Sequence, residues 1–161
     1  MILYYLDASA WVKRYYRETG TDWVQNLFVQ NPTLACASLG VVEVMATLAR
    51  KRKAVEISPE LFEQKAQELE DDWSRFVQVQ FTTEVVDLAR RSAKTLALRG
   101  ADAIHLASAL VIRGRLEEND QLIFIGSDDE LLRAAESSGL VVIDPSEPEP
   151  HSPGSVRIRN D

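Results

Sequence analysis

The chain has 161 residues, 45% of them apolar, which is the size and composition of one globular domain around a single core. It has neither a run of roughly 18 apolar residues that could span a bilayer nor a signal-peptide pattern at its N-terminus. We therefore expect a cytoplasmic protein that does not enter the membrane. A net charge of -7 argues against a protein that simply coats nucleic acid, and the single cysteine, Cys36, excludes an internal disulfide and a thiolate metal cluster.

The first half of the chain alternates between short apolar runs and segments with helical spacing. Met1 to Leu6 is an apolar run that ends at an acid, which suits a buried strand, and from Ser9 the apolar residues recur with a helical period. Ser58 followed by Pro59 is typical of an N-cap with proline at the first helical position. The expected elements are a strand over 1–6, a helix from Ser9, a helix capped by Thr21 or Asp22 and ended by Pro32, a strand over 33–37, a helix over about 40–53, and a helix from Ser58 to Trp73.

The second half continues the same alternation. Gly100 is expected to break one helix, and residues 101–112 are apolar nearly all round, which is typical of a buried helix. Ser127 and Glu130 have capping-box spacing, so we expect Ser127 to be the N-cap of a helix that Gly139 closes. The expected elements are an edge strand over 77–81, a helix from Thr83 to about Leu98, the buried helix, a strand over 122–125, the capped helix, and a strand over 140–143.

This alternation favours an α/β domain over residues 1–144, with a mainly parallel central sheet and helices on both faces. From Pro145 the chain holds four of its six prolines, with Ser and Glu interspersed, so residues 145–161 are expected to form a disordered tail. Parallel sheets of this kind bind ligands in the crevice beyond the carboxyl ends of the strands, where the strand order reverses.

Four carboxylates occupy positions that solubility alone does not explain. Asp7 directly follows the first strand, Asp128 closely follows the strand over 122–125, Glu43 lies among valines in the first turns of a helix, and Asp102 heads the most apolar helix. Carboxylates crowded near a core repel one another and lose hydration unless cations compensate. Ligands that are all oxygen suit Mg²⁺ or Mn²⁺, which lower the pKa of a bound water and offset charge on a phosphodiester, so hydrolysis would need no nucleophilic side chain.

Each of these acids also has an ordinary structural interpretation. Asp7 and Asp128 can cap helices, and Glu43 and Asp102 gain from the dipole at a helix N-terminus. An unpaired charge among the apolar neighbours of Asp102 would be costly, however, and the strand-end position of Asp7 favours a ligand. Asp129, like Asp128, suits the first turn of the helix that follows.

Other polar and aromatic residues give weaker signals. His105, one turn after Asp102, can act on a leaving group, but a lone histidine in a buried helix is more often a packing residue. Basic residues near three of the acids either grip phosphates that flank a cleaved bond or form a solvated face. These basic residues are Lys13, Arg14, Arg17, Arg50–Lys53 and Arg99. The three tryptophans, Trp11, Trp23 and Trp73, are expected in the core or in a dimer contact rather than as base-stacking platforms.

Four segments of this chain resemble, in order and spacing, the four motifs of PIN domains. The resemblance is to bacterial VapC-type toxins in particular. The segments are LDASAWVKRYY, SLGVVEVMATLAR, LRGADAIHLASAL and FIGSDDELLRAAESSGL, and the resemblance runs from about Leu3 to Ile143. It implies a three-layer α/β/α PIN-like fold and a metal-dependent endoribonuclease that uses Mg²⁺ or Mn²⁺. The acids that match the family's catalytic and metal-binding positions are Asp7, Glu43, Asp102 and Asp128.

The resemblance also implies partners and two local details. It implies the toxin of a type II toxin–antitoxin system, a homodimer, an RNA substrate, and inhibition by a cognate antitoxin protein. Ser9 matches the small polar residue of the first motif, which can bond a metal-ligated carboxylate. Gly126 is a departure, because similar sequences often carry Thr there, and the hydroxyl near the fourth acid is missing.

Other functions fit part of this pattern. A phosphotransfer enzyme or receiver domain also gathers acids at strand ends, but phosphatases with an aspartyl nucleophile usually have a second Asp where this chain has Ser9. A catalytically silent PIN-like module that binds RNA or protein stays open, although all four acids are present. DNA cleavage also stays open, because attack on a phosphodiester does not itself demand a 2′-hydroxyl.

Overall fold

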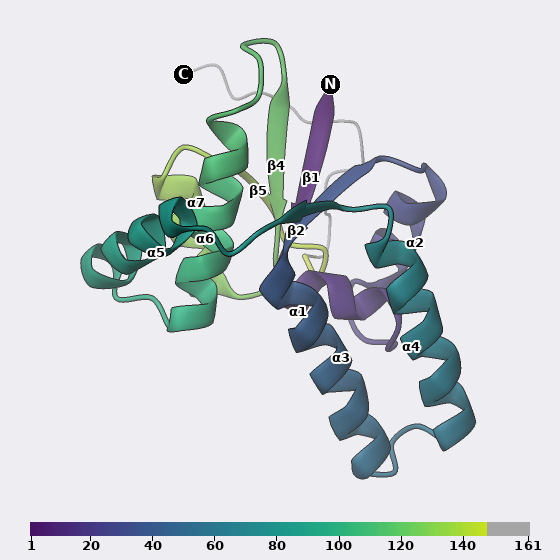
Figure 1. Cartoon of the computed structure of the whole chain (residues 1–161). Helices are drawn as coiled ribbons and strands as arrows, with labels where there is room; N and C mark the ends of the chain where they lie inside the picture. Colours follow the sequence, from purple (N-terminus) through teal and green to yellow (C-terminus); the bar gives the residue numbers. More distant parts are fainter. Residues whose placement is uncertain (148–161) are drawn as a thin grey trace.

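The computed structural model describes residues 1–147. These residues form a sheet that is flanked by helices (Figure 1). The strands are β1 (Ile2–Leu6), β2 (Thr33–Ala37), β3 (Val77–Val79), β4 (Gln121–Ile125) and β5 (Val141–Ile143). The helices are α1 (Ala8–Trp11), the 3₁₀ turn η1 (Val12–Arg14), α2 (Thr21–Val29), α3 (Ser38–Lys53), α4 (Pro59–Trp73), α5 (Thr83–Leu96), α6 (Gly100–Arg113) and α7 (Asp129–Ser137).

The sheet has five strands in the order β3-β2-β1-β4-β5, and every pairing is parallel. The strand order reverses at β1, since β2 and β3 extend the sheet on one side and β4 and β5 on the other. In open α/β sheets this switch point forms a crevice beyond the carboxyl ends of the central strands. The predicted α/β/α fold with a parallel sheet is confirmed, and its expected ligand crevice lies beyond β1 and β4.

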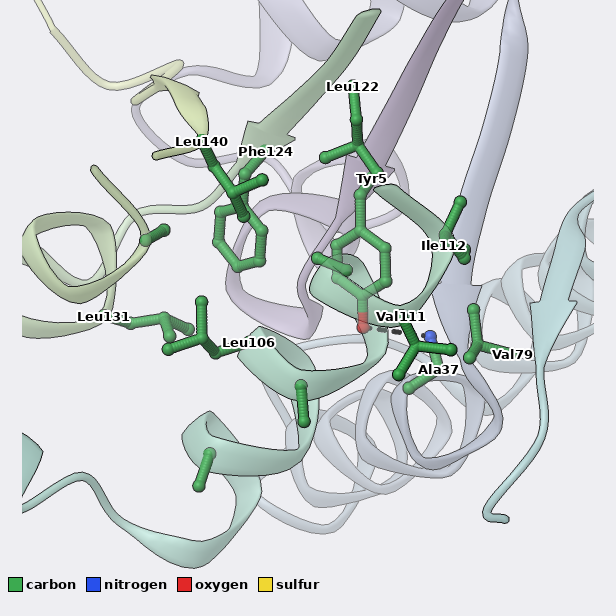
Figure 2. Packing of buried hydrophobic residues seen from close by; sticks show 14 of the residues in the cluster. Tyr5, Ala37, Val79, Leu106, Val111, Ile112, Leu122, Phe124, Leu131 and Leu140 are labelled. Carbon is green, nitrogen blue, oxygen red and sulfur yellow. Dashed lines mark hydrogen bonds between the residues drawn. The ribbon is translucent and has the colours of Figure 1, made fainter. Parts of the chain in front are cut away.

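Two cores lie on opposite faces of the sheet because neighbouring residues of a strand point in opposite directions. Tyr5 and Phe124 face α5, α6 and α7, and their rings stack with centroids 5.3 Å apart. Figure 2 shows this cluster, with Leu106 of α6 and Leu131 of α7 on the Phe124 side of the two rings. Leu6 and Ile125 face the other core, which α1, α2, α3 and α4 cover. Cys36 is a buried free thiol in this second core, as expected.

A buried polar network holds the start of the chain against α4. The Asp72 carboxylate accepts hydrogen bonds from Tyr15 Oη at 2.7 Å and from Arg14 Nε at 3.1 Å. Trp11 is fully buried and stacks on Phe76 at 4.5 Å, which confirms that it is a core residue. This network fixes α1 and η1, and so the helix that follows the first acid.

Several element boundaries differ from those expected. The break between α5 and α6 is made by Ala97, which has a left-handed φ of 53°, whereas Gly100 is the first residue of α6. The expected N-cap at Ser127 is wrong: Asp128 caps α7, because its carboxylate accepts from the Leu131 N–H at 2.9 Å. The edge strand also ends at Val79, two residues earlier than the alternating pattern predicts.

The described chain ends beside the carboxyl edge of the sheet. Pro145 is buried, and Ser146 Oγ donates to the Thr19 carbonyl at 3.2 Å. The remainder of the tail expected over 145–161, residues 148–161, lies outside the described residues. Among the described helices, none combines the length and apolar character that a membrane crossing requires.

Candidate functional site

Asp7 lies at the end of β1 with its side chain almost fully buried. Its backbone N–H continues the ladder to β4 by donating to the Ile125 carbonyl at 3.0 Å. The carboxylate caps α1 by accepting from the Ala10 N–H at 2.9 Å, and Ser9 Oγ lies 2.7 Å and 2.9 Å from its two oxygens. Asp7 therefore both follows the end of β1 and caps α1, so the two interpretations of this residue do not exclude each other.

Ser9 joins the carboxyl ends of β1 and β4. Its hydroxyl donates to Asp7 and accepts from the Ser127 backbone N–H at 3.0 Å, across 118 positions of sequence. Gly126 lies between β4 and Ser127, and a Cβ built there would stand 3.0 Å from Asp7 Oδ2. The absent side chain at Gly126 thus leaves room for the Asp7 carboxylate in its present position.

Asp102 and Asp128 meet at one cationic group. Arg99 donates to Asp102 Oδ2 from Nε at 2.9 Å and to Asp128 Oδ2 from a terminal nitrogen at 3.3 Å. Arg99 is the N-cap of α6, and its side chain is 73% exposed, so the bridge lies at the surface of the site. The two acids, from α6 and from the N-terminus of α7, are therefore brought together by the fold.

Glu43 is bonded to a histidine. Its Oε1 lies 2.6 Å from Nε2 of His105, which is buried in α6. Burial itself lowers the pKa of His105, but Tyr5, Cys36 and the Glu43 carboxylate together raise it well above its ordinary value. The expectation of an ordinary packing histidine was incomplete, because His105 is buried and also bonds one of the four acids.

The electrostatics of Asp7 connect these groups. Burial is the largest influence and raises the pKa of Asp7, while the nearby His105 and the hydrogen bonds from Ser9 and Ala10 act against the rise. Asp102 adds to it by repulsion. The carboxylate of Asp7 therefore carries its charge in an unfavourable place unless a further cation approaches.

The side chains at this edge of the sheet offer oxygen donors of the kind that a divalent cation binds. Within residues 1–147, no three histidine, cysteine, aspartate or glutamate side chains form a ready-made metal cage. Mg²⁺ rarely uses such a cage, since it keeps several waters and takes one or two carboxylates together with substrate phosphates. A cation already stands at part of the site, because the Arg99 guanidinium bridges Asp102 and Asp128. The oxygen donors and the buried charge of Asp7 fit an open Mg²⁺ or Mn²⁺ site.

A groove runs from this site along α3. Its walls come from the first turns after β1 and from one face of α3, and Ser9 and Glu43 stand near each other on them. Arg50 lies on the same face two turns beyond Glu43, and it donates to Thr47 Oγ1 at 3.0 Å. The lining residues are Ala8, Ser9, Val12, Val42, Glu43, Ala46, Thr47 and Arg50.

The other basic residues near the first acid have partners. Lys13 is buried and bonds Glu18 at 2.9 Å, and Arg17 bonds Asp22 at 3.1 Å. Arg14 is part of the Asp72 network. Phosphate contact and a solvated face were both left open for these residues, and their ion pairs make these three cations less available to a phosphate. Arg50 and Arg99 are exposed, and Arg99 contacts Asp102 and Asp128 directly.

Two features of the site were not found from the sequence. Tyr5 was assigned only to a strand, yet its hydroxyl lies 2.9 Å from Nδ1 of His105. Gly40 was expected only near the start of a helix, yet a Cβ there would collide with Cys36 Sγ and stand 3.3 Å from His105 Cε1. Both depend on how α6 crosses the sheet, and an alternating strand pattern carries no information about that crossing.

Comparison with known proteins gives a consistent result. The PIN domain family model matches residues 4–137. Ribonuclease VapC45 of Mycobacterium tuberculosis (strain CDC 1551 / Oshkosh) is 36% identical over 112 residues, which cover 70% of this chain and 78% of that protein. Among solved structures, PAE2754 of Pyrobaculum aerophilum has a TM-score of 0.62 at 18% identity, covering 88% of this chain and 83% of that one. A toxin-antitoxin complex from Klebsiella pneumoniae has a TM-score of 0.59 at 16% identity, covering 88% of this chain and 96% of that one.

Proposed function

Because the chain belongs to the PIN domain family, we propose that it is a metal-dependent endoribonuclease and the toxin of a type II toxin–antitoxin system. The observation that carries the proposal is the convergence of Asp102 and Asp128 on a cationic group, at the same edge of the sheet as buried Asp7. A relative at 36% identity that is named a ribonuclease supports RNA as the substrate.

Asp7, Glu43, Asp102 and Asp128 are the residues that would hold the metal, and Mg²⁺ or Mn²⁺ is the ion that their oxygens suit. When bound, the ion supplies a Lewis acid that activates water and offsets negative charge at the phosphodiester. No nucleophilic side chain is required in such a reaction, which agrees with a site built from carboxylates.

The chain's own residues position this chemistry. Ser9 and the Ala10 N–H hold the Asp7 carboxylate in one orientation, and burial keeps bulk water from that carboxylate. RNA would lie along the α3 groove, where Arg50 is exposed and can pair with a phosphate that flanks the cleaved bond. Arg99, which is exposed and contacts Asp102 and Asp128, is the residue that could pair with a second phosphate.

Cleavage of RNA tests this proposal directly. The purified chain is incubated with transfer-type and other structured RNAs in Mg²⁺ or Mn²⁺, with a chelator as the metal-free arm. We expect Asp7→Asn to reduce cleavage at least ~100-fold, the upper range for losing a group that supports a metal site. The fold should be retained, because the Asn side-chain carbonyl can still accept from the Ala10 N–H.

Asp129→Asn is the matched control, since Asp129 is an exposed neighbour of the site and loses the same charge. Cleavage should be unchanged in this variant. If the parent cuts none of the RNAs, or if its cleavage persists unchanged in Asp7→Asn and so does not come from this site, the alternative of a catalytically silent PIN-like module that binds RNA or protein is favoured.

The toxin role is tested in cells. Expression of the chain alone should arrest growth. Co-expression of the protein encoded beside it, which is the expected antitoxin, should relieve the arrest. Asp7→Asn should be harmless at the same protein level. Harmless expression of an active parent would remove the toxin role and leave the ribonuclease. The resemblance to VapC-type toxins also supports a homodimer, which light scattering of the purified chain measures.

A further inference from the structure

We propose that His105 is a positioning residue that fixes the Glu43 carboxylate for the metal. Tyr5 bonds the other side of the His105 ring, and Gly40 leaves room for the ring. This inference rests on the proposed metal-dependent function, because it concerns one of the four acids. It assigns a role to a buried histidine that the reaction itself does not require.

The hydrogen-bond chain begins inside the sheet and ends at the groove. The Ala37 N–H, at the end of β2, donates to Tyr5 Oη at 3.1 Å (Figure 2). Tyr5 Oη lies 2.9 Å from His105 Nδ1, and His105 Nε2 lies 2.6 Å from Glu43 Oε1. The tyrosine and imidazole rings meet edge to face at 6.0 Å. Backbone, tyrosine, histidine and glutamate thus form one continuous chain across three layers.

The direction of the last bond follows from its partners. An ionised carboxylate can only accept hydrogen bonds, so Nε2 must carry the hydrogen that lies between His105 and Glu43. The Tyr5 oxygen accepts from the Ala37 N–H and also lies 2.9 Å from Nδ1, where either the phenol or the ring can be the donor, so the contact holds the ring in both protonation states. This arrangement presents Nε2–H to Glu43 and holds the ring in one orientation.

Gly40 makes the approach of His105 possible. A side chain at Gly40 would collide with Cys36 Sγ and press on His105 Cε1 at 3.3 Å. Gly40 lies one helical turn before Glu43 on α3, so the open space at Gly40 is next to the carboxylate that His105 reaches. A glycine inside a helix is unfavourable by roughly 0.5–1 kcal/mol relative to alanine, and here it admits the imidazole.

Positioning matters because Glu43 is otherwise a flexible side chain. It is 31% exposed and lines the α3 groove, where a free glutamate would sample several rotamers. The bond from a buried ring fixes Oε1 and leaves Oε2 for a cation. Any buried imidazole needs hydrogen-bond partners, and the partner that His105 Nε2 finds at 2.6 Å is a carboxylate on the wall of the groove.

Metal affinity without RNA is the first test. Mn²⁺ is titrated into the full chain and free Mn²⁺ is followed by electron paramagnetic resonance. We expect His105→Leu to raise the Mn²⁺ dissociation constant about 10- to 100-fold, the usual effect of removing a partner that orients a ligand. His105→Gln, which can place an amide N–H near the former Nε2, should recover most of the affinity.

Ser108→Ala is the matched control on the same helix. Among the described residues, Ser108 is buried and its hydroxyl has no hydrogen-bond partner, so its loss should change neither folding nor Mn²⁺ binding. If His105→Leu fails to fold, His105→Gln and Tyr5→Phe carry the test. Tyr5→Phe keeps the ring and removes the hydroxyl behind His105, and it should weaken Mn²⁺ binding by a smaller factor.

A metal-free readout separates the two proposals. Nitrogen-15 spectra of the histidine side chains should show a hydrogen on Nε2 of His105 in the parent, and a bare Nε2 would overturn the inference. A parent that binds Mn²⁺ equally well with and without His105 would also overturn it, while leaving the ribonuclease intact. A parent that neither binds Mn²⁺ nor cuts RNA would overturn the proposed function as well.

Discussion

Asp102 and Asp128 are held together by one shared counter-ion. The Arg99 guanidinium reaches Asp102 Oδ2 at 2.9 Å and Asp128 Oδ2 at 3.3 Å. Without that positive charge, two carboxylates would repel each other at the edge of the site. The same exposed side chain also stands where a divalent ion would compete for the carboxylate oxygens.

Arg99→Gln should therefore bind Mn²⁺ more tightly than the parent when no RNA is present. The expected gain is roughly 2- to 5-fold, the range of an exposed ion pair. Titration calorimetry at low salt measures it. Arg90→Gln is the control, because Arg90 is equally exposed and pairs with Asp87 on α5, away from the acids. Weaker binding by Arg99→Gln would mean that Arg99 supports the acids rather than competing with the metal.

Metal-free Asp7→Asn should be more stable than the metal-free parent at pH 7. Burial raises the pKa of Asp7 above 3.8, so the folded chain holds this proton more tightly than the unfolded chain. The free energy of unfolding of the parent then falls as pH rises from 3.8 through the folded pKa, and it stays lower above that pKa. Asn does not ionise, so the difference in melting temperature should vanish as pH falls toward 3.8.

Mg²⁺ should reduce this difference by stabilising the parent alone. Thermal unfolding at several pH values, with and without Mg²⁺, makes the comparison. Asp129→Asn should show no such pH dependence relative to the parent. A parent that is the more stable protein at pH 7 without metal would contradict the unfavourable burial of the Asp7 charge.

Gly126→Ala should destabilise the fold by about 1–3 kcal/mol, the usual effect of overpacking a filled site. The added Cβ would stand 3.0 Å from Asp7 Oδ2 and 3.3 Å from Phe124 Cε1. Asp7 cannot retreat easily, since Ser9 and the Ala10 N–H hold it. Urea unfolding measures the change. At Gly100 nothing lies within 4 Å of an added Cβ, so Gly100→Ala should be neutral or stabilising, and equal losses in both variants would refute the steric argument.

Arg50→Ala should weaken RNA binding about equally for all sequences and reduce the salt dependence of binding by about one unit of slope. Arg50 shares the groove with Glu43 and is exposed, so a phosphate contact there would release counterions. The inactive Asp7→Asn background allows binding to be measured without cleavage. An unchanged slope would place the RNA elsewhere, and Arg90→Ala controls for the loss of a distant surface charge.

Much of the fold was predictable because local patterns and the sheet agree. The apolar runs before Asp7 and Asp128 predict buried strands, and parallel strands bring the residues at their carboxyl ends to one edge of the sheet. The cap of α7 was less predictable, since Ser127 and Asp128 can both cap a helix. Asp128 takes the position because Ser127 is turned toward Ser9 and Asp144.

Contacts between distant helices were not predictable from one sequence. His105 and Glu43 lie 62 positions apart and meet only because α6 and α3 cover opposite faces and reach the same edge. Lys13 looked like a surface cation, yet it is buried with Glu18 nearby. In each case the missing information is which faces of two helices approach each other, and helical period alone does not specify it.

The strand order also sets when the centre can exist during synthesis. β1, the first strand made, lies between β2 and β4, and its register with β4 pairs Ile2 with Gln121 and Leu6 with Ile125. The surroundings of Asp7 therefore cannot form until β4 and the start of α7 have emerged from the ribosomal exit tunnel. A nascent chain that ends at Leu116 contains Asp7, Glu43 and Asp102 but lacks β4 and Asp128, so the proposed site cannot assemble until almost the entire domain has been translated.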